Sequence, residues 1–231
     1  MPEKLYYEIT ALPTLGPLGS EPSLRPAELL ARLAHVPQAH RLLEALLLSE
    51  DLLQRESVQA GETEHPEPIV LSEAQLRGEL PLPDSLQPEP GQREPRVPAD
   101  ALWQRYYRHT AELAEAGSSG FLADWVQYEV GLRNALVAAR AKALDLEPSE
   151  YTVCEDLGRE EQLYDAAVSE WAAAADPLAG LRALDRRRWE WIESAAPSYS
   201  FEVDEILAYA AKLMLLSRWE RLEAAAERAG T

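Results

Sequence analysis

The fold class is decided by residues 121–146, which have the sequence FLADWVQYEVGLRNALVAARAKALDL. Apolar residues recur there at steps of three or four. They are Phe121, Trp125, Tyr128, Leu132, Ala135, Ala139, Ala143 and Leu146. Because an α-helix has 3.6 residues per turn, this spacing places them on one face of a single long helix. Glu129 and Arg133 add an i,i+4 pair in the stabilising orientation.

Helical patterns continue on both sides of this segment. We expect helices over residues 99–116, 159–175 and 177–196, and a last helix that begins near Phe201. No alternation typical of a half-buried strand occurs after residue 30. The sequence therefore predicts an all-α fold built from helical bundles.

The N-terminal part, residues 1–55, differs in composition at its start from the helical segments. Residues 5–13 are rich in aromatic and β-branched side chains, which favour a short strand or an extended arm. After Pro26 the leucines recur with helical spacing, interrupted at Pro37. We therefore expect a short extended segment followed by N-terminal helices.

The segment 56–98 is acidic and contains or borders on eight of the 17 prolines, a spacing that excludes a long helix. Ser72 and Gln75 have the spacing of a capping box, and they predict one short helix that ends near Gly78. The remainder is expected to be a proline-rich linker to a main helical bundle over 99–231.

The charge of the chain limits its partners. With 40 acidic and 22 basic residues, the formal net charge is −18. Nucleic acids and anionic lipid surfaces are bound through Lys and Arg, so neither is expected as a direct partner. A basic protein surface would be attracted, mainly through a faster association rate.

The expected compartment is the cytoplasm. Cys154 is the single cysteine, so no intramolecular disulfide forms, and the acidic start of the chain is unlike a secretory signal. The longest mainly apolar stretch, residues 206–216, is too short to span a bilayer. Contact with the inner membrane is expected only through partners, as a peripheral member of a complex.

Residue types that can bind metals or act in catalysis are scattered along the sequence. His35 and His40 are separated by Pro37 and do not share a helical face, and no paired metal-ligand motif occurs. Cys154 precedes Glu155 and Asp156, whose charges raise the pKa of a thiol and keep it unreactive. We predict no catalytic residue, no cofactor and no metal site.

One cluster has the composition of a protein-binding hot spot, in which arginine and tryptophan are enriched. The interface candidates are Arg186, Arg187, Arg188, Trp189 and Trp191. The alternative is that the arginines pair with nearby acids and that the tryptophans are partly buried. Three other tryptophans lie on helical stripes and are expected in the core. They are Trp103, Trp125 and Trp171.

Two segments are similar to helices of the C subunit, also called d, of V-type and archaeal A-type ATPases. The first is WVQYEVGLRNALVAARAKAL, residues 125–144, with matching positions Glu129, Arg133, Asn134, Arg140 and Lys142. The second is EILAYAAK, residues 205–212, with matching positions Tyr209 and Lys212. The chain as a whole also resembles an uncharacterised bacterial family that is encoded within V-type ATP synthase operons.

The resemblance implies a mechanical role. In those ATPases the C subunit is a helical funnel that seats the central shaft on the membrane rotor ring and has no catalytic residues. Stalk and ring subunits would then be the partners, and the matching positions would tie helices together within the bundle. The chain departs from the family because it is too short for three pseudo-repeats and has LMLLSRW at residues 213–219, where the subunit places an acid and Asn-Leu-Arg.

Two other functions stay open. The chain could be a stand-alone adaptor or assembly factor that binds a partner through segment 56–98 as an extended ligand. It could also be an enzyme of unrecognised type, which would show polar groups with perturbed pKa values around a pocket.

Overall fold

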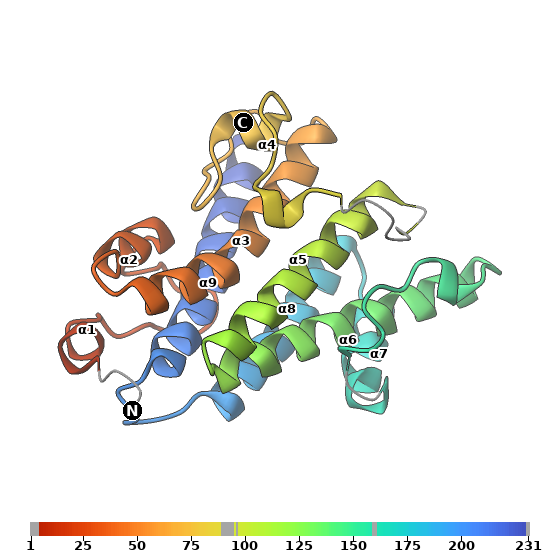
Figure 1. Cartoon of the computed structure of the whole chain (residues 1–231). Helices are drawn as coiled ribbons and strands as arrows, with labels where there is room; N and C mark the ends of the chain where they lie inside the picture. Colours follow the sequence, from red (N-terminus) through yellow and green to blue (C-terminus); the bar gives the residue numbers. More distant parts are fainter. Residues whose placement is uncertain (1–4, 89–94, 96, 159–160, 230–231) are drawn as a thin grey trace. The chain divides into compact units, whose positions relative to one another are not determined.

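A computed structural model describes residues 5–88, 95, 97–158 and 161–229 (Figure 1). Their regular structure consists of α-helices and short 3-10 turns, without a strand. The predicted all-α fold class is confirmed. The chain forms two compact units: unit 1 is Met1–Glu79 with Arg188–Thr231, and unit 2 is Leu80–Arg187.

Unit 1 is organised around two long helices. Its elements are α1 (Tyr6–Thr10), α2 (Pro26–Arg32), α3 (Pro37–Gln59), α4 (Glu73–Arg77) and α9 (Val203–Ala229). Helices α3 and α9 pack side by side (Figure 1). Both helices carry leucines that are at most 2% exposed and belong to the core of unit 1, and each contributes roughly 1.5–3 kcal/mol relative to an exposed side chain. These include Leu42, Leu43, Leu46, Leu47, Leu207, Leu213 and Leu216.

The N-terminal arm, residues 5–15, does not begin as predicted. Tyr6–Thr10 forms the short helix α1 instead of a strand or extended chain. The backbone N–H of Ala11 donates to the carbonyl of Tyr7 at 3.1 Å, and the Thr10 hydroxyl donates to the carbonyl of Tyr6 at 2.6 Å. Strand propensity is a weak local preference, and packing against distant residues overrides it here.

Much of the predicted linker is packed structure. Helix α3 continues to Gln59 before the chain turns. The capping box is confirmed, because Ser72 and Gln75 exchange hydrogen bonds of 3.3 and 2.9 Å between side chain and backbone. Gly78 ends α4 with a φ of +78°, which glycine adopts without strain. Leu71 and Leu76 are buried, so this part of the segment belongs to the core of unit 1.

The compact units have different bounds from the three segments predicted from the sequence. The first 79 residues pack with the last helix, and unit 2 begins at Leu80, inside the predicted linker. The physical reason is that α3 and α9 bury their apolar faces against each other. Residues 89–94 and 96 of the predicted linker lie outside the described part of the chain.

Unit 2 is built on α5 and α6, which lie side by side in Figure 1. Its elements are η1 (Asp84–Leu86), α5 (Pro98–Ala116), α6 (Gly120–Ala143), η2 (Pro148–Glu150), η3 (Glu161–Tyr164) and α7 (Asp165–Ala172). On α5, the rings of Trp103, Tyr106 and Tyr107 contact one another at 5.2–5.6 Å between centroids. Tyr164 packs directly over Gly131 of α6, where a Cβ atom would lie 2.3 Å from the Tyr164 hydroxyl.

The helix boundaries follow the prediction with two differences. Helix α6 ends at Ala143 rather than residue 146, because Asp145 turns the chain with a φ of +55°. The helix predicted over 159–175 is α7, preceded by η3; residues 159 and 160 lie outside the described part of the chain. Helix α8 (Pro177–Ala195) begins as predicted, and Asp176 caps it by accepting a hydrogen bond of 2.7 Å from the N–H of Ala179.

Over the described ranges, none of the helices combines the length and the apolar character that crossing a bilayer requires.

Candidate functional site

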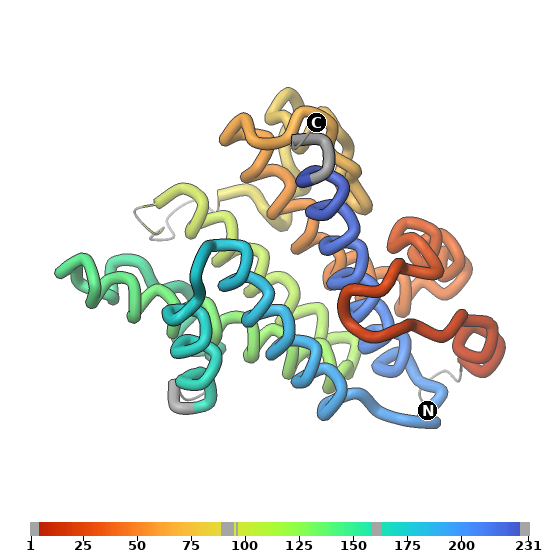
Figure 2. Tube along the Cα trace, turned by 180° about the vertical axis from the view of Figure 1, so that it is seen from behind, coloured from red at the N-terminus to blue at the C-terminus, as the bar shows by residue number. Residues whose placement is uncertain are grey.

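The N-terminal arm is fastened to the start of α9 (Figure 2). The backbone N–H of Leu5 donates to the carbonyl of Phe201 at 2.8 Å, and the ring centroid of Tyr6 lies 4.5 Å from that of Phe201. Farther along, the Tyr209 hydroxyl donates to the carbonyl of Pro13 at 2.9 Å. Three contacts from separate residues therefore hold the arm in place.

Two hollows lie beside the arm, and Leu12 lines both. The larger has a volume of about 350 Å³ and opens between the arm and α9. The smaller has a volume of about 270 Å³ and opens between the arm, α2 and Ile206. Apolar side chains form most of both walls, with few polar groups at their edges. Such concave apolar sites are where binding is expected on a folded chain.

Three exposed tyrosines lie on the segments that line these hollows or next to them. Tyr7 lines the smaller hollow and is 80% exposed, and Tyr6 beside it is 55% exposed. Tyr199 is 85% exposed and belongs to the turn that connects Pro197, which lines the larger hollow, to Phe201. The sequence predicted an arm here but did not identify these tyrosines as binding residues.

The five residues of the predicted arginine and tryptophan cluster differ in their exposure and in their contacts. Arg186 is exposed, whereas Arg187 forms an ion pair with Glu170 within unit 2. Arg188 and Trp191 are half-buried. Trp189 is only 9% exposed. Arg186 therefore has the most accessible side chain of the five, and the binding role of the cluster stays a prediction.

The polar residues of the predicted motif on α6 make intramolecular contacts. Arg133 pairs with Asp100 at 2.6 Å, and its guanidinium lies 5.4 Å from the ring centroid of Trp103. Arg140 lies over the ring of Trp171 at 5.7 Å. These contacts connect α6 with α5 and α7. At the flanks, Glu129 is half-buried and Lys142 is exposed.

Asn134 holds the loop after α6. Its side-chain amide donates to the carbonyl of Val153 at 2.8 Å and accepts from the N–H of Val153 at 3.0 Å. Val153 is buried, so water would not replace either bond without opening the loop. The neighbouring Cys154 is buried as well, and its thiol contacts the carbonyl of Gln104 at 3.5 Å.

We expect Asn134→Ala to lower the free energy of unfolding by about 2 kcal/mol, because both backbone groups of Val153 lose their partner. The change should also speed alkylation of Cys154, the single cysteine, by loosening its loop. Urea unfolding and iodoacetamide labelling measure the two effects. Lys142→Ala, on the same helix but exposed, is the control and should change stability by less than about 0.5 kcal/mol. Unchanged labelling of Cys154 in Asn134→Ala would contradict the expectation.

The motif residues on α9 also contact neighbouring elements of unit 1. Besides the bond from Tyr209 to the arm, the Lys212 ammonium lies 3.2 Å from a Glu193 carboxylate oxygen and 4.9 Å from the ring centroid of Trp189. The indole N–H of Trp189 donates to the same carboxylate at 3.1 Å. Lys212, Trp189 and Glu193 therefore connect α8 to α9.

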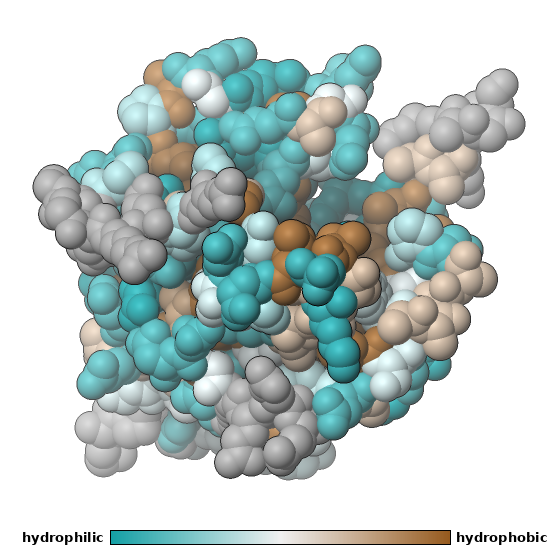
Figure 3. Space-filling model, turned by 90° about the vertical axis from the view of Figure 1, so that its right-hand side faces the viewer, coloured by the Kyte–Doolittle hydropathy of each residue, from teal (hydrophilic) through white to brown (hydrophobic). Residues whose placement is uncertain are grey.

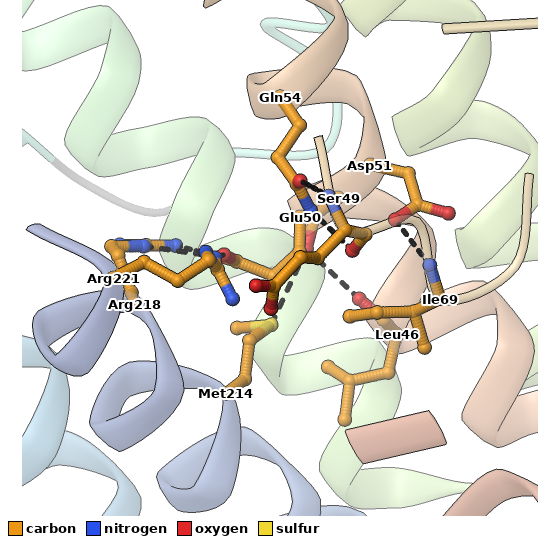
Figure 4. Close-up of polar contacts among 10 residues, drawn as sticks. Leu46, Ser49, Glu50, Asp51, Gln54, Ile69, Met214, Arg218 and Arg221 are labelled. Carbon is orange, nitrogen blue, oxygen red and sulfur yellow. Dashed lines mark hydrogen bonds and ion pairs between the residues drawn. The ribbon is translucent and has the colours of Figure 1, made fainter. Parts of the chain in front are cut away.

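Glu50 places a buried carboxylate on α3 (Figure 4) and is 1% exposed. It accepts hydrogen bonds from Arg218 at 3.1 Å and from Arg221 at 2.6 Å, both on α9. Burial alone would raise the pKa of Glu50, but attraction and hydrogen bonds from the two guanidinium groups hold it below its ordinary value. Glu50 is therefore ionised at neutral pH, and its hydrogen bonds to Arg218 and Arg221 link α3 to α9.

The next residue, Asp51, is also fully buried and accepts three backbone hydrogen bonds. The N–H groups of Ile69, Val70 and Leu71 donate to its two oxygens at 2.8, 2.7 and 2.7 Å, and Figure 4 shows the bond from Ile69. Burial raises the pKa of Asp51, although these donors favour the charged form. One turn later, Gln54 exchanges two hydrogen bonds with the backbone of Glu67, at 2.7 and 3.0 Å. These side chains attach the segment before α4 to α3.

The thiol of Cys154 is buried. Burial raises the pKa of its thiol to about 11, and the nearby Asp156 charge adds to this effect. The thiolate that nucleophilic chemistry needs is therefore a very small fraction at neutral pH. Among the described residues, His, Cys, Asp and Glu side chains do not gather into a group that could hold a metal ion.

Apolar side chains reach the surface of unit 2 too, and Figure 3 shows hydrophobic residues exposed among hydrophilic ones. The large exposed side chains of this kind in unit 2 are Leu80, Leu144, Leu146, Leu163 and Leu178. The described leucines of unit 2 line neither of the two hollows beside the arm.

A family model described as a protein of unknown function (DUF2764) matches residues 156–228, which include α7, α8 and most of α9. This part of the chain contains the arginine and tryptophan cluster and the α9 motif, while the α6 motif lies before it. Searches of curated proteins and of solved structures returned no significant match.

Proposed function

We propose that this chain is a non-catalytic subunit of the central stalk of a bacterial V/A-type ATPase, similar in role to the C (d) subunit, and that it couples the rotor shaft to the membrane ring. The observation that carries the proposal is the resemblance of two segments, residues 125–144 and 205–212, to helices of that subunit. Both segments lie almost wholly in long helices, α6 and α9.

The use of the polar residues supports a mechanical role. The matching residues Arg133, Asn134, Tyr209 and Lys212 all bind other parts of the same unit. A subunit that transmits force needs helices that are firmly tied together, and contacts of this kind supply that stiffness. The proposed location is the cytoplasm, peripheral to the inner membrane through the complex.

An adaptor or assembly factor that binds through segment 56–98 is the alternative. It needs that segment to be available as an extended ligand. Asp51 and Gln54 bind the backbone at 67–71, and Leu76 is fully buried, so this half of the segment would have to detach first. The contacts therefore favour the stalk subunit.

Affinity purification of the tagged chain from its own cells in mild detergent, followed by native mass spectrometry, tests the proposal. Recovery of V-type ATPase stalk and ring subunits in fixed ratio is the expected result. Recovery of the chain alone, or with unrelated soluble proteins, would remove the rotary-ATPase assignment and leave the fold unaffected.

Arg186→Glu is expected to weaken this complex without changing the melting temperature, because Arg186 is exposed. Arg187→Glu is the contrasting variant. It removes the pair with Glu170 and places two like charges together, so it should lower the melting temperature as well. Recovery of the complex is measured alongside thermal unfolding. If Arg186→Glu leaves recovery unchanged, the arginines act only in local pairing.

A further inference from the structure

We propose that the two hollows beside the N-terminal arm, together with Tyr6, Tyr7 and Tyr199, form a docking surface for a basic, amphipathic segment of a partner protein. This surface is distinct from the arginine and tryptophan cluster. It does not depend on the identity of the partner complex, so it holds or fails separately from the stalk-subunit proposal.

The shape of the surface favours a macromolecular segment over a single small ligand. The hollows, of about 350 and 270 Å³, are separate and lie on either side of Leu12. Each is at or below the lower end of the size of a small-molecule pocket, roughly 300–1,000 Å³. A peptide or helix can place one large apolar side chain in each hollow and pass its backbone over Leu12.

The aromatic residues favour a protein partner. Tyr7, which lines the smaller hollow, is 80% exposed, and Tyr199, two residues after Pro197 of the larger hollow, is 85% exposed. Tyrosine is enriched at protein–protein hot spots because it offers a large rigid apolar area with a polar tip. The arm that carries Tyr7 is anchored by Leu5 and Pro13 on both sides, so little order has to be gained on binding.

The turn that presents Tyr199 is strained. Tyr199 has a φ of +57° and Phe201 a φ of +55°, a region that non-glycine residues enter at a cost of about 1–2 kcal/mol each. Phe201 gains packing against Tyr6, at 4.5 Å between ring centroids. Tyr199 is almost fully exposed and gains no comparable burial within the fold. Strain of this kind is concentrated at functional positions.

The charged residues near the hollows indicate the charge that a partner segment would carry. Glu205 lines the larger hollow, Asp204 precedes it in the first turn of α9, and Glu202 lies just before that helix. Of the basic side chains in the two linings, Lys212 is paired with Glu193 and His35 with Glu8, and Arg32 is the third. On a chain of net charge −18, this rim attracts a segment that carries lysine or arginine beside its apolar anchors.

The test uses a phage-displayed library of random peptides, selected on the full-length chain at physiological salt. The enriched peptides are expected to combine two large apolar residues with an excess of Lys and Arg. A synthetic copy should lose about tenfold or more in affinity for Tyr199→Gly and for Tyr7→Ala. Tyr199→Gly should leave the melting temperature unchanged or higher, because glycine adopts the observed φ freely. Leu163→Ala, at an exposed apolar position of unit 2, is the matched control and should bind like the wild type.

Several results would overturn the proposal. Peptides that bind Tyr199→Gly and Tyr7→Ala as tightly as the wild type would place the binding surface elsewhere. Enrichment of acidic peptides would contradict the charge argument. Self-association that is seen by sedimentation and lost in Tyr199→Gly would replace the peptide segment by a second copy of the chain.

Discussion

Replacing Glu50 by alanine is expected to lower the free energy of unfolding by about 3–5 kcal/mol. The Glu50 carboxylate is 1% exposed and is the shared partner of Arg218 and Arg221. Without it, two guanidinium groups are left close together in the α3–α9 contact, where little water reaches them. Removing one member of a buried charged group is far more costly than the net stabilisation that the intact group provides. Urea unfolding followed by far-ultraviolet circular dichroism measures the loss.

Glu44→Ala is the matched control for this variant. Glu44 lies on the same helix and also makes an ion pair, with His40 at 3.3 Å, but both side chains of that pair are only half-buried. Its removal should change stability by less than about 0.5 kcal/mol. A third variant replaces Glu50, Arg218 and Arg221 together by apolar residues and should recover most of the loss. If Glu50→Ala is no worse than Glu44→Ala, the network does not stabilise the α3–α9 contact.

The same network predicts a response to acid. Because the pKa of Glu50 is lowered in the folded chain, the unfolded chain binds the proton more readily, and stability falls as the pH drops below about 4.5. Burial raises the pKa of Asp51, which acts in the opposite direction just above its ordinary value of 3.8. The Glu50 contribution is therefore isolated by comparing the wild type with Glu50→Gln, whose stability should decline less steeply in acid.

Local signals in the sequence located most helices correctly. The α6 stripe, the capping box at Ser72 and the Asp-Pro pair at 176–177 each act within a few residues, and each was found where it was predicted. Such signals specify a helix by its own backbone geometry and its own ends. They do not specify which helices pack together.

Long-range contacts account for what the sequence did not reveal. Glu50 and Arg218 are 168 residues apart, and Leu5 contacts Phe201. The periodicity of α3 or α9 alone does not reveal these pairings. The contact of the N-terminal arm with Phe201 was therefore not foreseen, and α1 was expected to be extended chain. A signal for the polar network was present, since Glu50 and Asp51 interrupt a leucine-rich helix on its buried side. Two adjacent acids between apolar residues indicate buried partners.

The candidate binding surface was only partly predictable for the same reason. The aromatic and β-branched composition of the arm distinguished it from the rest of the sequence. The hollows, however, exist because the arm, α2 and the start of α9 meet. The strain at Tyr199 is a property of backbone angles that a tyrosine in a sequence does not reveal. By contrast, the predicted hot spot was judged on composition, and folding buried Trp189 and paired Arg187.

Asp51→Ala is expected to release the segment before α4 from α3 and to lower the free energy of unfolding by about 3 kcal/mol or more. Three backbone N–H groups, from Ile69, Val70 and Leu71, lose their acceptor at once. An unsatisfied buried donor costs about 1–3 kcal/mol, and Leu71 is the most deeply buried of the three. Hydrogen exchange at these three amides measures the release directly and should become faster than at amides in the middle of α9.

Asp51→Asn keeps the size of the side chain but replaces one of its two acceptor oxygens by an amide nitrogen, which is a donor. Its remaining carbonyl can still accept from one side, whereas its amide nitrogen turns a donor toward the N–H groups, so the loss should lie between the wild type and Asp51→Ala. Gln54→Ala, which removes only the bonds to Glu67, is the matched control and should release residue 67 while 69–71 stay protected. If instead the amides of 69–71 exchange at the wild-type rate in Asp51→Ala, the segment is held by the burial of Leu71 and Leu76 alone. In that case this half of the proline-rich region depends on apolar packing, and the extended-ligand alternative would need only that packing to be undone.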